Sequence, residues 1–205
     1  MLMRLKQWEP GDIDALLELV NIGVGRASGA LSELATAEIK LAVPELVVAD
    51  KSTLAAALGQ EMAGQSVTVS QKFTGKFSGT ATLVFLEQAS RQLVEIILGN
   101  LGETTVTPDL EGEALEEIGN IVINSCLGAV ADMLEIPIAI DLPLLFKGDA
   151  VRSVLSGDGA ADWEILLVSV HLSSEPEGIG GLIVLSMSPT ETEKLWTCLR
   201  EYCCV

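Results

Sequence analysis

The sequence predicts an α+β fold, with long helices packed on a mostly antiparallel β-sheet and two tandem, pseudo-symmetric halves. Two observations lead to this prediction. Long segments with apolar residues at three- and four-residue spacing alternate with short β-branched runs of strand character. The same succession of patterns, with several of the same polar residues, occurs twice. We therefore expect one domain over 1–205, made of two repeats at about 11–100 and 109–205.

Each half is expected to open with a long helix and to close with a strand and a second helix. The first half should contain, in order, a helix over 11–37, strands over 39–49, 66–74 and 78–86, and a helix over 87–99. The second half should contain a helix over 109–135, strands over 136–146, 150–155, 164–172 and 179–187, and a helix over 189–200. The segment 52–64 has the character of a short helix, and the Gly, Thr and Pro residues of 100–108 predict the joint.

The composition excludes several classes of function. Twelve Lys and Arg residues stand against 29 Asp and Glu, a formal net charge of −17 that would repel nucleic acid and an anionic membrane surface. No apolar run is long enough to span a bilayer, so we expect no membrane insertion and a cytoplasmic protein. The four cysteines lack the spacing of a zinc site, and Cys126 is expected in the core.

Polar residues recur at the same spacing in the two long helices. Asp14, Glu18, Asn21 and Pro44 have counterparts about 100 residues later, which are Glu113, Glu117, Asn120 and Pro143. Spacings of four and three residues place each acidic–acidic–amide trio on one helix face, turned away from the apolar stripe. Each proline is expected to return the chain to the level of the asparagine and to mark a strand start or edge.

A single such trio would be read as an ordinary solvated helix face. Its recurrence changes that interpretation, because asparagine is a mediocre helix former and has no packing reason to be kept in mid-helix twice. The sequence therefore predicts two equivalent sites, each with a carboxylate and a carboxamide one turn apart.

The pattern Asp/Ser-x3-Glu-x2-Asn-x22-Pro, present twice apart from its first position in the second copy, resembles the signature of the CheC, CheX and FliY chemotaxis phosphatases, and Asn21-Ile-Gly-Val-Gly25 resembles the first CheC helix. Glu113 departs from the Asp or Ser usual in the family. The resemblance implies a protein aspartyl-phosphate phosphatase that hydrolyses the phosphoryl group of a CheY-like response regulator. Glu18, Asn21, Glu117 and Asn120 would be catalytic, and Asp14, Pro44, Glu113 and Pro143 supporting.

The resemblance also implies the roles of these residues and the partners. Each asparagine would orient the in-line water, and each glutamate would pair with the lysine of the regulator. The chain would need no cofactor of its own, with Mg²⁺ expected in the regulator, and CheD would be a second partner. No histidine base is required, and His171 is the only histidine.

Two other functions remain open at this stage. One is a non-catalytic module that binds CheY or CheD, resembling the middle domain of the flagellar switch protein FliM. The other is an unrelated hydrolase using Glu116 or Glu117 with Glu113. Adjacent helix residues point to different faces and cannot readily flank one bond, which disfavours the second alternative.

Overall fold

A computed structural model describes residues 10–36, 38–49, 56, 65–100, 106–155, 164–173 and 179–203. The first half contains α1 (Pro10–Ala35), β1 (Lys40–Ala49), β2 (Ser66–Gly75), β3 (Gly79–Leu86) and α3 (Glu87–Asn100). The second half contains α4 (Pro108–Met133), β4 (Ile138–Ile140), β5 (Leu144–Gly148), α5 (Ala150–Leu155), β6 (Glu164–Ser173), β7 (Ile179–Met187) and α6 (Pro189–Cys203).

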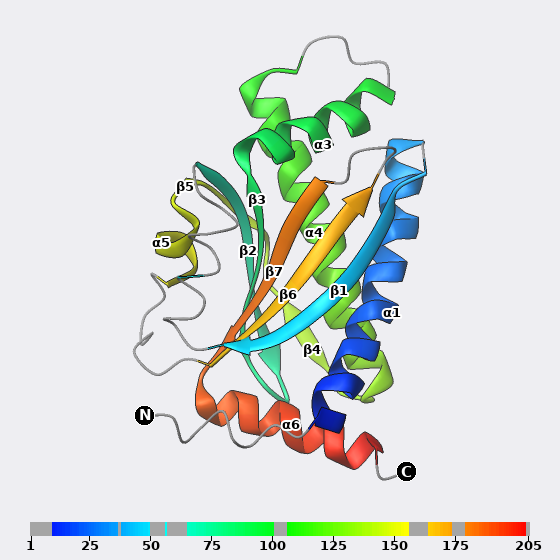
Figure 1. The fold of residues 1–205 in the computed structure, drawn as a ribbon, viewed down its shortest axis with the longest axis vertical. Helices are drawn as coiled ribbons and strands as arrows, with labels where there is room; N and C mark the ends of the chain where they lie inside the picture. The colour runs from blue at the N-terminus through cyan, green and yellow to red at the C-terminus, as the bar shows by residue number, and fades with distance from the viewer. Residues whose placement is uncertain are drawn as a thin grey trace.

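The strands form one seven-stranded sheet in which every recorded pair is antiparallel (Figure 1). The order is β1-β6-β7-β3-β2-β4, and β5 continues beside β2 on the same edge as β4. Strands β3 and β7 pair at the centre of the sheet. The hairpin β2–β3 of the first half is flanked by β4 and β5 of the second half, and the hairpin β6–β7 of the second half is flanked by β1 of the first half. A duplicated unit would give this order, although the division into two repeats stays a prediction.

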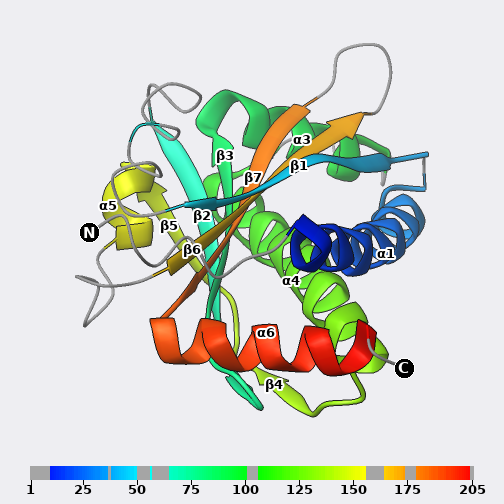
Figure 2. The same cartoon turned by 60° about the horizontal axis from the view of Figure 1, so that its bottom comes forward.

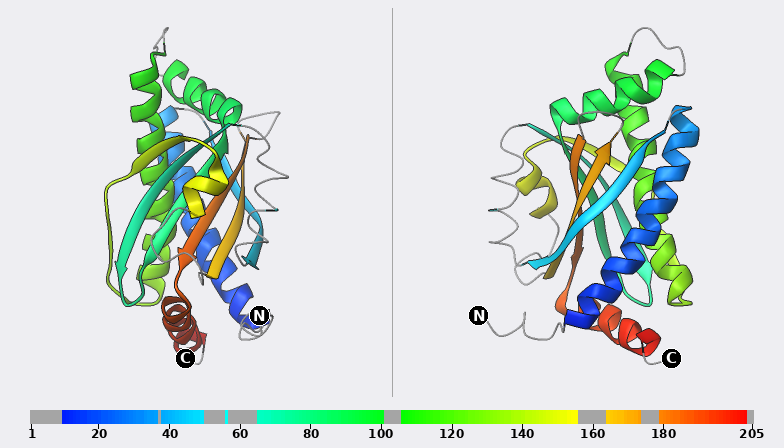
Figure 3. Two further views of the ribbon diagram at one scale, coloured as in Figure 1. Left: turned by 90° about the vertical axis from the view of Figure 1, so that its left-hand side faces the viewer. Right: turned by 45° about the vertical axis from the view of Figure 1, so that its right-hand side comes forward.

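Two long helices cover one face of the sheet. Helices α1 and α4 run antiparallel to each other on that face, and α5 lies on the opposite side (Figures 1 and 3). Helices α3 and α6 lie at opposite ends of the molecule, with α6 across the end where α1 begins (Figure 2). The predicted α+β class, with helices packed on an antiparallel sheet, is confirmed.

Apolar periodicity and local capping explain why α1 and α4 form. Buried residues of both helices join one core cluster with the inner faces of β2, β3 and β7. Thr107 caps α4 by accepting a hydrogen bond from the backbone N–H of Leu110 at 3.3 Å, and Pro108 occupies the first turn. At the end of α1, the hydroxyl of Ser32 accepts from the backbone N–H of Ile39 at 2.8 Å. This bond fixes the turn from α1 into β1.

The second half departs from the predicted elements in two places. Residues 150–155 form helix α5 rather than a strand, because Asp149 caps it: its carboxylate accepts from the backbone N–H of Arg152 at 2.8 Å. The predicted strand over 136–146 is divided into β4 and β5, with a break at 141–143. Apart from Ala56, the predicted helix over 52–64 lies outside the described residues, as do residues 101–105 of the joint.

Helix α4 has the length and mean hydropathy of a membrane span, alone among the described helices. Half of its apolar stretch is buried inside the molecule, where it packs against α1 and the sheet. This is the environment of a core helix in a globular domain.

Candidate active site

The polar residues predicted on the first helix lie together on an exposed face of α1. The side chains of Asp14, Glu18 and Asn21 are exposed, whereas Leu16 and Val20 are buried. The carboxylate and the carboxamide therefore stand one turn apart on the surface. No group in the described part of the chain hydrogen-bonds the Asn21 carboxamide. We call Glu18 and Asn21 the first site, which is open to a partner.

The equivalent residues on α4 differ from one another in solvent exposure. Glu113 and Glu117 are exposed, but Asn120 is only half-exposed. We call Glu117 and Asn120 the second site. The expectation of two equivalent, outward-facing sites therefore fits Glu18, Asn21 and Glu117, whereas the side chain of Asn120 is partly buried and is hydrogen-bonded to Gln71 of β2.

Two neighbouring side-chain amides donate hydrogen bonds to the carboxamide oxygen of Asn120. Its Oδ1 accepts from Nδ2 of Asn124 at 2.5 Å and from Nε2 of Gln71 at 3.1 Å. Asn124 is one turn further along α4, and Gln71 is a residue of β2 that is only 2% exposed. A carboxamide oxygen has two lone pairs, so both are engaged inside the protein.

Backbone carbonyls fix the orientation of both neighbouring amides. Nδ2 of Asn124 also donates to the backbone carbonyl of Asn120 at 2.7 Å, and Nε2 of Gln71 donates to that of Asp141 at 2.8 Å. A carbonyl oxygen can only accept, so each amide must present its NH₂ group on that side. Asn120 must therefore present its oxygen to both donors and leave its own NH₂ group as the available end.

The two prolines lie in irregular parts of the two sheet edges. Pro44 is within edge strand β1, where the pairing with β6 shifts register between Ala42 and Glu45. Pro143 lies in the break between β4 and β5, two residues after Asp141. Because Gln71 bridges Asp141 and Asn120, this break lies beside the second site. Pro44 thus lies inside an edge strand, which is one of the two positions predicted for it, at an irregularity in the strand pairing.

An apolar surface flanks the second site on the same edge. Leu142, Leu144 and Phe146 are 85%, 70% and 46% exposed. Next to them, the ammonium group of Lys147 pairs with the carboxylate of Glu111 on α4 at 3.0 Å. The edge strand β5 is thus held to α4 by a partly exposed ion pair.

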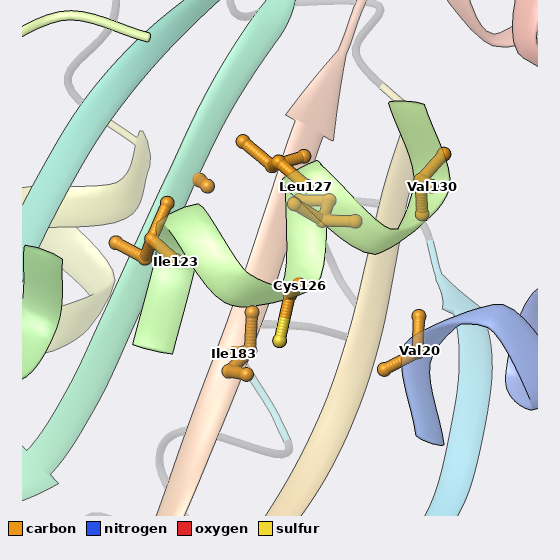
Figure 4. Close-up of a pocket in the computed structure, with 8 residues that line it drawn as sticks. Val20, Ile123, Cys126, Leu127, Val130 and Ile183 are labelled. Carbon is orange, nitrogen blue, oxygen red and sulfur yellow. The ribbon is translucent and has the colours of Figure 1, made fainter. Parts of the chain in front are cut away.

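A small apolar cavity lies among buried residues of the described structure, away from the two sites (Figure 4). Its volume is about 20 Å³, and it lies between α1, α4 and the sheet. It is lined by Val20, Ala81, Ile123, Cys126, Leu127, Val130, Ile183 and Leu185. Its lining is apolar, so it offers no hydrogen-bonding group that would orient a polar ligand. Burial raises the pKa of the Cys126 thiol to about 12, in agreement with the predicted core position.

Gln71 and Asn124 were not among the residues predicted from sequence. Asn124 follows Asn120 at a spacing of four, which places two amides on one helix face and could have drawn attention to it. Gln71 is a lone amide in a strand whose inward positions are otherwise apolar or hydroxyl-bearing. Its contact with α4 depends on the packing of distant segments.

The geometry of the two sites can bind a partner and orient a small group of atoms. Each site presents a carboxylate for a cation and a carboxamide that can accept or donate a hydrogen bond. In the described part of the chain, no three His, Cys, Asp or Glu side chains converge on a metal position. Chemistry here would depend on positioning a water molecule against a group that a partner supplies.

No family model matches the chain. CheC1 of Halobacterium salinarum, a candidate CheY-P phosphatase among curated proteins, is 26% identical over 131 residues. The match covers 63% of this chain and 66% of that relative. Among solved structures, FliY of Thermotoga maritima aligns with a TM-score of 0.77 at 18% identity, over 96% of this chain and 99% of that one. The chain resembles the CheC, CheX and FliY group in sequence and in fold.

Two further solved structures share the fold. The FliM middle domain of H. pylori aligns with a TM-score of 0.65 at 13% identity, over 93% of this chain and 99% of that one. CheX, in a complex with CheY, BeF₃ and Mg²⁺ from Borrelia burgdorferi, gives a TM-score of 0.54 at 15% identity, over 84% and 99%. The resemblance to the CheC/CheX/FliY group that the doubled motif predicted is confirmed.

Proposed function

We propose that the chain is a cytoplasmic phosphatase that hydrolyses the aspartyl phosphate of a CheY-like response regulator. The observation that carries the proposal is the exposed pair of Glu18 and Asn21, a carboxylate one turn from a carboxamide that has no hydrogen-bond partner in the described part of the chain. The match to CheC1 and the fold shared with CheX support the same chemistry.

Positioning is sufficient for this reaction. An aspartyl phosphate is hydrolysed when the oxygen of a water molecule attacks phosphorus in line with the bond to the carboxylate, which breaks to release inorganic phosphate. The transition state is loose, so holding the water in line matters more than deprotonating it. The Asn21 carboxamide would accept a hydrogen bond from that water. The Mg²⁺ and lysine of the regulator would stabilise the phosphoryl charge, so this chain supplies neither.

Glu18 and Glu117 would anchor the regulator rather than take part in bond breaking. Each exposed carboxylate can pair with an ammonium group, such as the lysine beside an aspartyl phosphate, one turn away from the asparagine. This arrangement would deliver the carboxamide to the phosphoryl group only when the partner is docked.

The proposal is tested by steady-state hydrolysis of a phosphorylated regulator. We expect Glu18→Gln with Glu117→Gln to raise KM with a smaller effect on kcat, because an anchoring contact is lost. Glu33→Gln is the matched control, since Glu33 is also an exposed carboxylate of α1. If the wild-type protein does not accelerate phosphate release, the proposed function is wrong.

A binding module without activity is the second candidate, since the FliM middle domain has a higher TM-score than CheX. In that case the wild-type chain would bind the phosphorylated regulator without shortening its lifetime. CheD as a further partner stays a proposal that rests on the family resemblance, and a pull-down with purified CheD would test it.

A further inference from the structure

The two sites differ in the hydrogen bonding of their asparagines. The Asn21 carboxamide is exposed and has no partner in the described part of the chain. The Asn120 oxygen is saturated by Asn124 and Gln71. An oxygen with both lone pairs engaged cannot accept from an attacking water until one internal hydrogen bond is broken.

We propose that Asn124 and Gln71 are positioning residues that restrain Asn120, so that the first site carries most of the turnover and the second is held back. The inference rests on the proposed function. It deepens that function by making the two Glu–Asn sites unequal and naming the side chains responsible.

The first site has neither donor. The residue of α1 that corresponds to Asn124, four positions after the asparagine, is Gly25, which has no side chain. Gln71 pairs with Ala81 across the first hairpin. In the second hairpin, Ile183 corresponds to Ala81 and pairs with Val168. Val168 is therefore the counterpart of Gln71, and a valine side chain has no hydrogen-bond donor. The sequence thus supplies the restraint on one side only.

The restraint is also built into the protein rather than being a surface contact. Gln71 is almost completely buried, and both N–H groups of its amide are used, one on Asn120 and one on the Asp141 carbonyl. Its Oε1 is buried and has no hydrogen-bond partner within the described structure. The amide therefore cannot turn over without placing an acceptor against the Asp141 carbonyl. Asn120 is held by donors that have no better alternative.

The first experiment isolates each site by single substitution and measures kcat and KM for the phosphorylated regulator. Asn21→Ala should lose most of the activity, and Asn120→Ala should lose little. In the Asn21→Ala background, Asn124→Gly should then raise kcat about five- to tenfold, the value of one hydrogen bond, with KM unchanged. Equal losses from the two single variants, or no gain from Asn124→Gly, would overturn the inference.

The second experiment transfers the restraint to the first site. A Cβ atom at position 25 would meet nothing within 4 Å, so the position is open to substitution, and Gly25→Asn places an amide four residues after Asn21. In the Asn120→Ala background, we expect Gly25→Asn to lower kcat about fivefold relative to Gly25→Ala. Gly29→Asn is the matched control, because position 29 is equally open but lies further along the helix. Equal activity of the Gly25→Asn and Gly25→Ala variants would contradict the inference.

A third measurement requires no turnover and separates this inference from the proposed function. Solvent exchange of the side-chain amide protons, measured by NMR, should be slower for Gln71 and Asn124 than for Asn21. Asn120→Ala should speed the exchange of Asn124. If the wild-type protein is inactive but these amide protons exchange slowly, the proposed function is wrong and the restraint on Asn120 still holds. If the amide protons of Gln71 and Asn124 exchange as fast as those of Asn21, the proposed restraint is wrong.

Discussion

Gly23 of α1 lies directly against the backbone of Cys126 of α4. A Cβ atom at position 23 would be 2.5 Å from the Cα atom of Cys126 and 2.9 Å from the carbonyl oxygen of Ser125. The two helices can approach this closely only because one of them has no side chain at the crossing. The contact sets the spacing of the two helices whose outer faces carry the two sites.

Replacing Gly23 with alanine should therefore destabilise the protein. Because the atoms met by the new methyl group are backbone, the helices must move apart, at a cost of about 1–3 kcal/mol. This should exceed the gain of about 1 kcal/mol in helix propensity. Urea denaturation measures the change in the free energy of unfolding. Gly29→Ala is the control: it meets nothing within 4 Å and should stabilise. Similar effects of the two substitutions would contradict the close crossing.

Gly119 plays the corresponding part where α4 packs on the sheet. A Cβ atom there would be 2.4 Å from a methyl carbon of Val69 on β2. We expect Gly119→Ala to destabilise by about 1–3 kcal/mol. Combining it with Val69→Ala should cost less than the sum of the two single changes, because the shortened side chain makes room. Additive losses in this double-mutant cycle would show that the two residues do not meet as described.

Cys126 should make stability depend on pH in the alkaline range. Burial raises the pKa of its thiol from 9.0 to about 12. Above pH 9 the unfolded chain therefore loses a proton that the folded chain keeps, and the free energy of unfolding falls as pH rises. The contribution is up to about 1.4 kcal/mol per pH unit. Cys126→Ala should show a shallower decline between pH 9 and 10.5 in reducing buffer; parallel declines would be inconsistent with a buried thiol.

Much of the fold was predictable because it depends on local patterns. The sustained apolar periodicity of α1 and α4 placed both helices within two residues of their observed ends. The sequence 150–155 was mistaken for a strand because its two valines and a leucine suggested β structure, whereas Asp149 supplies a helix cap. The local signal of the cap is stronger than the weak strand preference of six residues.

The exposure of most of the predicted site residues was predictable, but the asymmetry of their hydrogen bonding was not. Recurrence at fixed spacing singled out Glu18, Asn21, Glu117 and Asn120 without knowledge of the fold, and their catalytic role stays a prediction. The engagement of Asn120 depends on Gln71, a residue of another strand, and on the Asp141 carbonyl in a break between strands. Contacts of this kind are fixed by tertiary packing, so a helical pattern alone predicts two equal sites where the structure has unequal ones.

The central claim is tested most directly by the first-order rate of phosphate release from a phosphorylated CheY-like regulator. The comparison is between the wild-type chain and Asn21→Ala combined with Asn120→Ala, after circular dichroism has shown that both are folded. The account predicts that the double variant still binds the regulator but loses about a hundredfold in rate, because the water is no longer held in line. A double variant that retains the wild-type rate would contradict it.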